Sequence, residues 1–151
     1  MGMIKTITTT HKMKNKKANK NRADNWNGMN WIRQTKRLSI YLRDGLSCAY
    51  CGESVESGIK LTLDHIIPYS KQGSNHESNL ITACSTCNSA RGNRPINDFI
   101  AVVGDFFKNI KSDDVFDHIN ECKDRKLNKG EAEEMVARRG SAAKALAQFT
   151  L

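Results

Sequence analysis

Residues 48–88 read CAYCGESVESGIKLTLDHIIPYSKQGSNHESNLITACSTCN. The stretch begins and ends with a Cys-x-x-Cys pair, Cys48 with Cys51 and Cys84 with Cys87, and 32 residues separate the two pairs. Two residues between cysteines let both thiolates face one ion, and two such pairs complete a tetrahedron. The spacing therefore predicts a structural zinc ion, in preference to redox-active or merely buried thiols. Four sulfur ligands leave that ion no open position for catalysis.

The segment between the pairs is longer than in an ordinary zinc ribbon, so it must fold into elements of its own. Residues 60–67 alternate enough for a strand, and residues 69–78 have the composition of a loop. Residues 80–83 read as a second short strand, and Ser85 is a suitable N-cap for a helix over 85–92. The expected order is strand, loop, strand, helix.

Five residues in or next to this segment have side chains suited to phosphodiester hydrolysis: Asp64, His65, Asn79, Asn88 and Arg91. Asp64 and Asn88 offer hard oxygen donors, which suit a catalytic Mg²⁺ or Mn²⁺. A neutral histidine is the ordinary base near pH 7, and His65 fills that place beside the metal-binding Asp64. The side-chain carbonyl of Asn79 is expected to hold the imidazole in the useful tautomer. Arg91, one turn beyond Asn88, is expected to hold a phosphate.

One geometric question stays open in the sequence. In a regular strand, Asp64 and His65 face opposite ways. For both to act on one phosphate, the chain must twist or bulge there, or the substrate must lie across the edge of the strand with base and metal on opposite sides.

Helical spacing of apolar residues predicts helices on both sides of this segment. The first runs from Trp26 to Asp44 and ends at Gly45. Further helices are expected over 96–110, from Ser112, and from about Glu131 with an interruption at Gly140. Together with the two strands they make an α+β fold.

The ends of the chain differ from the centre in composition. Residues 1–23 carry seven Lys or Arg, no acidic residue and no apolar periodicity. Such a segment is expected to be mobile, either as a basic arm along phosphates or as a plain soluble tail. The expected organisation is a basic arm over 1–25, a core with its adjoining helices over 26–110, and a helical extension over 111–151.

The charge of the chain favours an anionic partner. The 151 residues carry a net charge of +8, with a pI of about 9.4. Nucleic acid leads the possible partners, and charge alone does not separate DNA from RNA or from membrane headgroups. Among nucleic acids, double-stranded DNA is the expected partner. No apolar run is long enough to span a bilayer and no secretory signal is visible, so we expect no membrane partner and a reducing cytoplasm. There, cysteines are ligands or buried thiols, and Cys122 is expected to be the latter.

These residues resemble the HNH endonuclease family, in the four-cysteine branch found in many phage and bacterial proteins. The resemblance covers roughly residues 37–95, and the residues that carry it are Arg37, Arg43-Asp44-Gly45, Cys48, Cys51-Gly52, Leu63-Asp64-His65-Ile66-Ile67-Pro68, Gly73, Asn79-Leu80, Cys84, Cys87-Asn88 and Arg91-Gly92. It implies a ββα-metal core, with Asp64 and Asn88 as metal ligands, His65 as general base and Asn79 orienting it. It also implies products with 3′-hydroxyl and 5′-phosphate ends. The third signature residue is often His in the family and is Asn88 here, and Arg91 takes the place of the usual Lys.

Two other classes of function are open. A zinc module that binds DNA or RNA without cutting it needs the cysteines and the basic surface but none of the five candidate catalytic residues. A structural or packaging protein would dock on a protein partner through its C-terminal helices. Among nucleases, homing, restriction and packaging roles are all possible.

Overall fold

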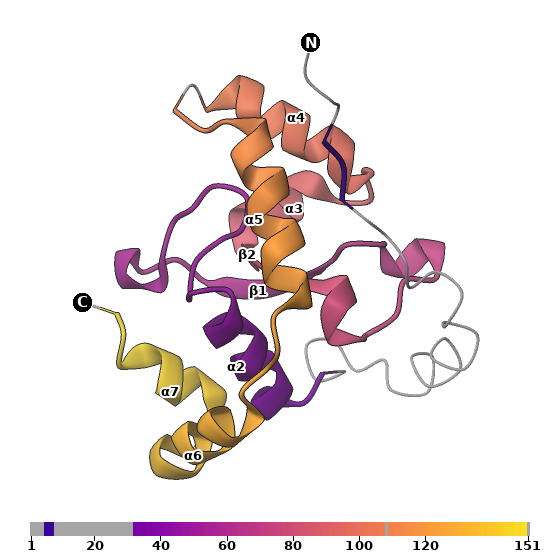
Figure 1. The fold of residues 1–151 in the computed structure, drawn as a ribbon. Coiled ribbons are helices and arrows are strands. Elements are labelled where there is room, and N and C mark those ends of the chain that lie inside the picture. The colour runs from indigo at the N-terminus through magenta and orange to yellow at the C-terminus, as the bar shows by residue number, and fades with distance from the viewer. Residues whose placement is uncertain (1–4, 8–31, 108, 151) are drawn as a thin grey trace.

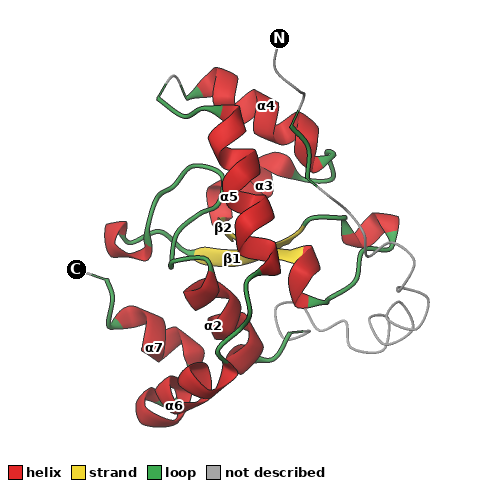
Figure 2. Ribbon diagram, in the orientation of Figure 1, coloured by secondary structure: helices red, strands yellow, loops and turns green. Residues whose placement is uncertain are grey.

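The predicted ββα order is present at the centre of the protein. The computed structural model describes residues 5–7, 32–107 and 109–150 and shows a small α+β fold (Figures 1 and 2). Strand β1, Leu61–His65, pairs antiparallel with β2, Leu80–Cys84, and helix α3, Ser85–Arg91, follows directly. The N-cap of α3 is Cys84 and not Ser85, because the Cys84 sulfur accepts a hydrogen bond from the backbone N–H of Cys87.

The two faces of this sheet are covered by different helices. Helix α2, Gln34–Arg43, packs on one face, where Leu61 and Leu63 meet its residues Ile40 and Tyr41. On the other face Ile81 packs in a core shared by α3 and two further helices, α4, Ile96–Phe106, and α5, Ser112–Asp124. Side chains alternate along each strand, so β1 presents Leu61 and Leu63 to α2 and presents Thr62 and Asp64 to the opposite side. Short 3₁₀ turns at Val55–Ser57, Tyr69–Lys71 and Glu77–Asn79 complete the loops around the strands.

The end of α2 is fixed to the sheet by a buried ion pair. Arg43 donates to Asp44, whose Oδ2 accepts from both the backbone N–H and the hydroxyl of Thr82 on β2. Arg43 also donates to the carbonyls of Glu77 and Leu80, so its guanidinium is held inside the protein. The chain then turns away at Gly45, which has φ +80 as predicted for the end of this helix.

The C-terminal segment packs on the rest of the protein. Helix α6, Lys129–Arg139, and helix α7, Ala142–Ala147, are separated at Gly140 as predicted. Both pack on α2 through a small cluster of buried residues: Leu38, Ala132, Met135, Ala142 and Ala145. Helix α5 belongs to the same core as α4, so residues 111–150 are not a separate body. Helix α4 ends at Phe106, earlier than the apolar spacing had indicated.

Part of the expected basic arm is also packed. Ile7 is only 5% exposed and joins the core beside α4 and α5, and its backbone N–H donates to Asn97. Lys5 pairs with Asp117 of α5, and Thr6 accepts a hydrogen bond from Asn120. The rest of the arm and residues 26–31 lie outside the described residues. The first helix was predicted from Trp26, but Arg33 is the N-cap of α2, so this helix begins only at Gln34. Within the described part of the chain, no helix combines the length and apolar character that crossing a membrane requires.

Candidate active site and cysteine cluster

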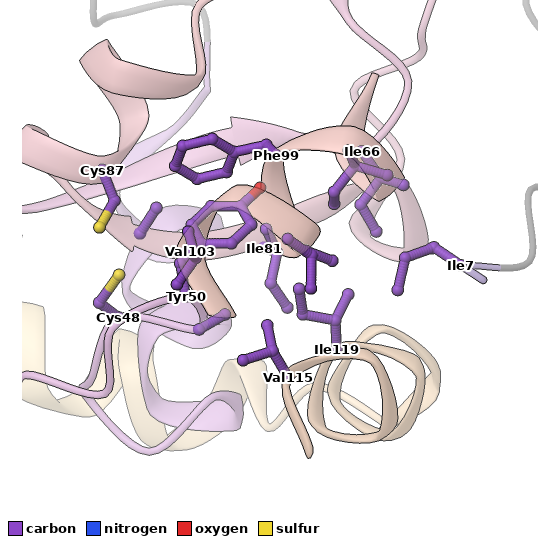
Figure 3. Close-up of a cluster of buried hydrophobic side chains, with 14 of the residues drawn as sticks. Ile7, Cys48, Tyr50, Ile66, Ile81, Cys87, Phe99, Val103, Val115 and Ile119 are labelled. Atoms are coloured by element: carbon purple, nitrogen blue, oxygen red, sulfur yellow. The ribbon is translucent and has the colours of Figure 1, made fainter. Parts of the chain in front are cut away.

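The four predicted zinc ligands come together. The sulfur atoms of Cys48, Cys51, Cys84 and Cys87 all lie within 4.8 Å of one another, and those of Cys51 and Cys84 are 3.9 Å apart. Zn–S bonds of about 2.3 Å in a tetrahedron place sulfurs roughly 3.8 Å apart, so the observed cluster fits the ion with little movement. Figure 3 shows the sulfurs of Cys48 and Cys87 turned toward each other.

The electrostatics of the cluster also suit a cation. The hydrogen bond from Cys87 lowers the pKa of Cys48 to about 5, while burial raises the pKa of Cys51 to about 12. The bond to Cys48 raises the pKa of Cys87. Cys48 is thus favoured as a thiolate that accepts a hydrogen bond from the Cys87 thiol, and a divalent cation would replace the remaining thiol protons and bind all four thiolates.

Backbone contacts bring the first pair of cysteines to β2. The N–H of Ala49 donates to the carbonyl of Thr82, and the N–H of Cys51 points to the sulfur of Cys48. Gly52 has φ +80, which lets the chain reverse directly after Cys51. The second pair lies at the start of α3, so this cluster joins the first loop, β2 and α3.

Asp64 lies at the end of β1 with one carboxylate oxygen already committed. Its Oδ2 accepts hydrogen bonds from the hydroxyl of Tyr50, at 2.5 Å, and from Nη1 of Arg91, at 2.8 Å. Among the described residues, none donates a hydrogen bond to the second oxygen, Oδ1. The carboxylate is 7% exposed, so it is held in one orientation and keeps one oxygen for a further ligand.

Tyr50 was not singled out in the sequence. It lies between the two cysteines of the first pair, and its ring packs edge-on against Phe99 with the centroids 4.9 Å apart (Figure 3). Burial, followed by the neighbouring charge of Asp64, raises the pKa of Tyr50 well above its ordinary value, so the phenol stays a hydrogen-bond donor. A large aromatic inside a cysteine knuckle was the only sequence signal for this contact.

Arg91 has a different position from the expected one. It is 1% exposed and donates to Asp64 and to the backbone carbonyls of His65, Ile66 and Arg94. All three of its nitrogens are used inside the protein. The guanidinium therefore fixes the end of β1 and does not reach a phosphate at the surface, because its partners surround it.

Asn88 is half-buried on α3 with its amide orientation fixed. Its Nδ2 donates to the hydroxyl of Thr62, at 2.9 Å, and to the carbonyl of Leu63, at 3.1 Å. A carbonyl cannot donate, so the atom that faces it must be the NH₂ group. The oxygen of Asn88 is therefore turned away from β1. Thr62 and Asp64 alternate onto the same face of the strand, so Asn88 and Asp64 share that face.

His65 is half-buried, and its imidazole contacts a residue that the sequence did not point to. Its Nε2 lies 2.8 Å from Oδ1 of Asn75. An amide oxygen only accepts, so Nε2 is the donor and the basic lone pair is on Nδ1. Asn75 is ten residues away in a loop of ordinary composition, and only the return of that loop brings it to the histidine.

Asn79 holds the loop in shape. Its Oδ1 accepts from the N–H of Ile67, and its Nδ2 donates to the carbonyls of Ile67 and Ser74. The side-chain carbonyl expected to contact His65 thus has Ile67 as its partner. Asn79 fixes both ends of residues 67–74, which lie between the histidine and Asn75.

The question of the two opposite faces is decided by the register of β1. Its pairing with β2 is unbroken from Leu61 to His65, without a bulge. Asp64 therefore points toward α3, as its contacts with Arg91 show, and His65 leaves the strand on the other side, toward Asn75. A phosphate that met both groups would lie across the end of the strand, between them.

Comparisons with known proteins agree with this geometry. Residues 48–94 match the family model of the HNH endonuclease. A stretch of 60 residues, 39% of the chain, is 38% identical to the CRISPR-associated endonuclease Cas9 of Corynebacterium diphtheriae, of which it covers 5%. The Cas9 of Actinomyces naeslundii is 37% identical over 60 residues, with the same coverage of both chains. This chain thus spans about 5% of the length of the curated relatives that it matches. No solved structure matches it.

Two antiparallel strands, the helix that follows them and a four-cysteine cluster that could hold a metal ion define a small ββα domain. Residues 48–94, which contain this fold, are an HNH endonuclease domain by their match to the family model.

Proposed function

We propose that this protein is a metal-dependent DNA endonuclease in which His65 is the general base and Asp64 and Asn88 hold the catalytic cation. The cation is Mg²⁺ or Mn²⁺, because both ligands are hard oxygen donors. The four cysteines hold a structural zinc ion. The substrate is double-stranded DNA, in keeping with the net charge of +8, and the source is a bacterium or its phage.

The observation that carries the proposal is the state of three side chains at one end of β1. Asp64 has one oxygen bound by Tyr50 and Arg91 and keeps the other for a ligand. Asn88 has its NH₂ group bound to β1 and its oxygen turned outward. His65 has Nε2 bound to Asn75 and therefore its lone pair on Nδ1. In each side chain, one polar atom is bound within the protein and another can take a ligand or a proton. A merely structural role does not explain this arrangement.

The reaction follows from these positions. When bound, the divalent cation supplies positive charge that stabilises the pentacovalent phosphate and the leaving oxygen. Nδ1 of His65 takes a proton from water, whose oxygen attacks phosphorus. The bond from phosphorus to the 3′ oxygen breaks, and that oxygen takes a proton from solvent. The products carry 5′-phosphate and 3′-hydroxyl ends. Asn75 holds the imidazole throughout by accepting from Nε2.

A plasmid assay tests the proposal. Supercoiled DNA is incubated with the protein and Mg²⁺ or Mn²⁺, and the ends of the products are mapped. We expect cleavage that EDTA stops and that His65→Ala lowers by about 10²- to 10⁴-fold, the usual contribution of a general base. His118→Gln is the matched control, because His118 lies on α5 and contacts Cys122, outside the proposed site. It should cut like the wild type.

The outcomes separate this proposal from a module that only binds. If wild type and His65→Ala bind DNA equally and neither cuts it, the protein is a zinc-containing binding module. If neither binds nor cuts but a defined protein co-purifies, the structural role through α6 and α7 is favoured. Equal cleavage by wild type and His65→Ala would assign the base to another group.

A further inference from the structure

A cavity lined by cations lies next to the proposed catalytic histidine. It has a volume of about 400 Å³ and lies between the N-terminal end of α2, the loop at Asn75 and the start of α6. Figure 1 shows α2 and α6 packed together at this side of the protein. Arg33, Lys36 and Lys129 line the cavity, and Glu133 is the one acidic residue among the lining residues.

The cations of the cavity have no carboxylate partner within the described part of the chain. None of the ion pairs there includes Arg33, Lys36 or Lys129, and Glu133 forms none either. Arg33 and Lys129 are exposed, while Lys36 is half-buried. Three positive charges face a common space that one acid does not neutralise.

Lys36 is held in place at the wall of the cavity. Its Nζ donates to the carbonyl of Asn75 at 2.6 Å, which uses one of its three N–H bonds. Burial lowers the pKa of Lys36, the charge of Glu77 raises it, and the nearby charge of Lys129 lowers it. An anion in the cavity would act in the same direction as Glu77 and favour the charged form of Lys36.

Asn75 connects this cavity to His65. Its backbone carbonyl accepts from Lys36, and its side-chain oxygen accepts from Nε2 of His65. One residue therefore separates the cation-lined cavity from the proposed base. Both lie on the side of β1 that faces α2, away from Asp64 and α3.

We propose that this cavity binds a backbone phosphate of the DNA strand being cut, next to the phosphate that is hydrolysed. The inference rests on the proposed function. A strand whose scissile phosphate lies across the end of β1 continues past His65 into the cavity. There the guanidinium of Arg33 can bind phosphate oxygens in pairs, and Lys36 and Lys129 act as point charges. Since Arg91 is buried, these three residues take over the phosphate-binding role expected of it.

Binding measurements in a His65→Ala background test the cavity without cleavage. The pocket variant is Arg33→Gln with Lys129→Gln, two exposed residues whose replacement should leave the fold intact. The control is Arg138→Gln with Lys144→Gln, which removes the same charge from the far end of α6 and from α7. We expect the pocket variant to bind a DNA duplex about tenfold more weakly and the slope of log K against log salt to fall by about one. The control should change affinity about twofold or less. Equal effects of the two pairs would reject a specific site.

Methylphosphonate substitution locates the bound phosphate. Neutral linkages are placed one at a time along the strand cut at a mapped site, and binding is measured for the wild-type cavity and for the pocket variant. A neutral linkage beside the scissile phosphate should weaken DNA binding about tenfold when the cavity is wild type. It should hardly change the binding of the pocket variant, because the phosphate and the cavity residues are coupled partners. If every position affects both proteins alike, the inference is wrong.

Two further measurements distinguish a free anion from a DNA phosphate, and failure of the cavity proposal from failure of the nuclease proposal. Inorganic phosphate at millimolar concentration should not abolish the difference between the variants, and if it does, the cavity binds a free anion and not a DNA strand. If the unmodified protein binds DNA but never cuts it, the nuclease proposal fails, and the salt slope alone then decides whether the cavity binds backbone phosphate. If the wild type cleaves DNA normally and the pocket and control variants bind DNA alike, only the proposal of a phosphate site in the cavity is rejected.

Discussion

The hydroxyl of Tyr50 lies 2.5 Å from Oδ2 of Asp64 and so joins the cysteine cluster to the proposed catalytic centre. Tyr50 stands between Cys48 and Cys51, and Asp64 is at the end of β1. Any ion that fixes the knuckle therefore also fixes the carboxylate. The proposed zinc site and the proposed site of the catalytic cation are thus connected through the hydrogen bond from Tyr50 to Asp64.

Replacement of Tyr50 by Phe should weaken the use of Mg²⁺. The ring keeps its packing on Phe99, but Asp64 loses one of its two donors and can rotate. We expect the Mg²⁺ concentration at half-maximal cleavage to rise about 10- to 100-fold, as for other residues that orient a metal ligand. Tyr41→Phe is the control, since the hydroxyl of Tyr41 donates to the carbonyl of Leu61. It should leave the Mg²⁺ dependence unchanged, and a shared shift would contradict the specific role of Tyr50.

Arg91→Ala should destabilise the fold more than it alters contacts with DNA. Arg91 is buried against Asp64, and removal of one partner of a buried ion pair costs about 3–5 kcal/mol. Urea unfolding of this variant should show that loss, while Arg94→Ala, at an exposed position, should change stability by about 0.5 kcal/mol or less. Normal urea stability with weak DNA binding would instead restore the phosphate-binding role for Arg91.

Asn75→Ala and Asn79→Ala should fail in different ways. Asn75 orients the imidazole, so its loss should lower kcat by roughly tenfold to a hundredfold with KM and thermal stability nearly unchanged. Asn79 is 3% exposed and makes three hydrogen bonds to the loop, so its loss should lower the melting temperature. Steady-state kinetics and thermal unfolding of both variants make the comparison. A melting temperature lowered by Asn75→Ala and spared by Asn79→Ala would reverse these assignments.

Gly73→Ala should open the loop after His65. A Cβ at this position would lie 1.7 Å from the carbonyl oxygen of Ile67 and 2.9 Å from Nδ2 of Asn79, so the backbone must move. We expect cleavage to fall by about 10²-fold or more, since small displacements of a base are costly. Gly130→Ala, whose added Cβ meets nothing closer than 3.7 Å within α6, is the control and should be neutral or slightly stabilising. Equal activity of the two variants would show that the loop tolerates the shift.

Loss of zinc should unfold the centre of the protein, unlike loss of Mg²⁺. Structural zinc supplies on the order of 10 kcal/mol in small domains, and the four cysteines proposed to hold it here come from the first loop, β2 and α3. The purified protein should hold one zinc per chain, and a chelator that competes with thiolates should abolish cooperative thermal unfolding. Cys87→Ser should do the same, while Cys122→Ser should keep the zinc, because Cys122 lies apart on α5. Full stability of the zinc-free protein would make the cluster dispensable.

The sequence by itself determined the cluster of four cysteines and the order of the elements. Ligand spacing in Cys48–Cys51 and Cys84–Cys87 is a local property, and so are the alternation in β1 and the glycines at 45 and 140 that end helices. The predicted ββα order and the cysteine cluster are therefore confirmed. The roles of His65, Asp64 and Asn88 remain predictions, which their geometry supports.

Tertiary structure decided which groups meet, and in which direction they point. It paired Arg91 with Asp64, Asn75 with His65, and Asn79 with the backbone of the loop through hydrogen bonds. These groups meet because residues 66–79 fold back, and no short sequence spacing relates them. It also placed the cationic ends of α2 and α6 beside Asn75. Contacts between distant segments depend on how helices and loops pack on the sheet. A linear pattern of residue types records the chemistry of each group but not its neighbours in space.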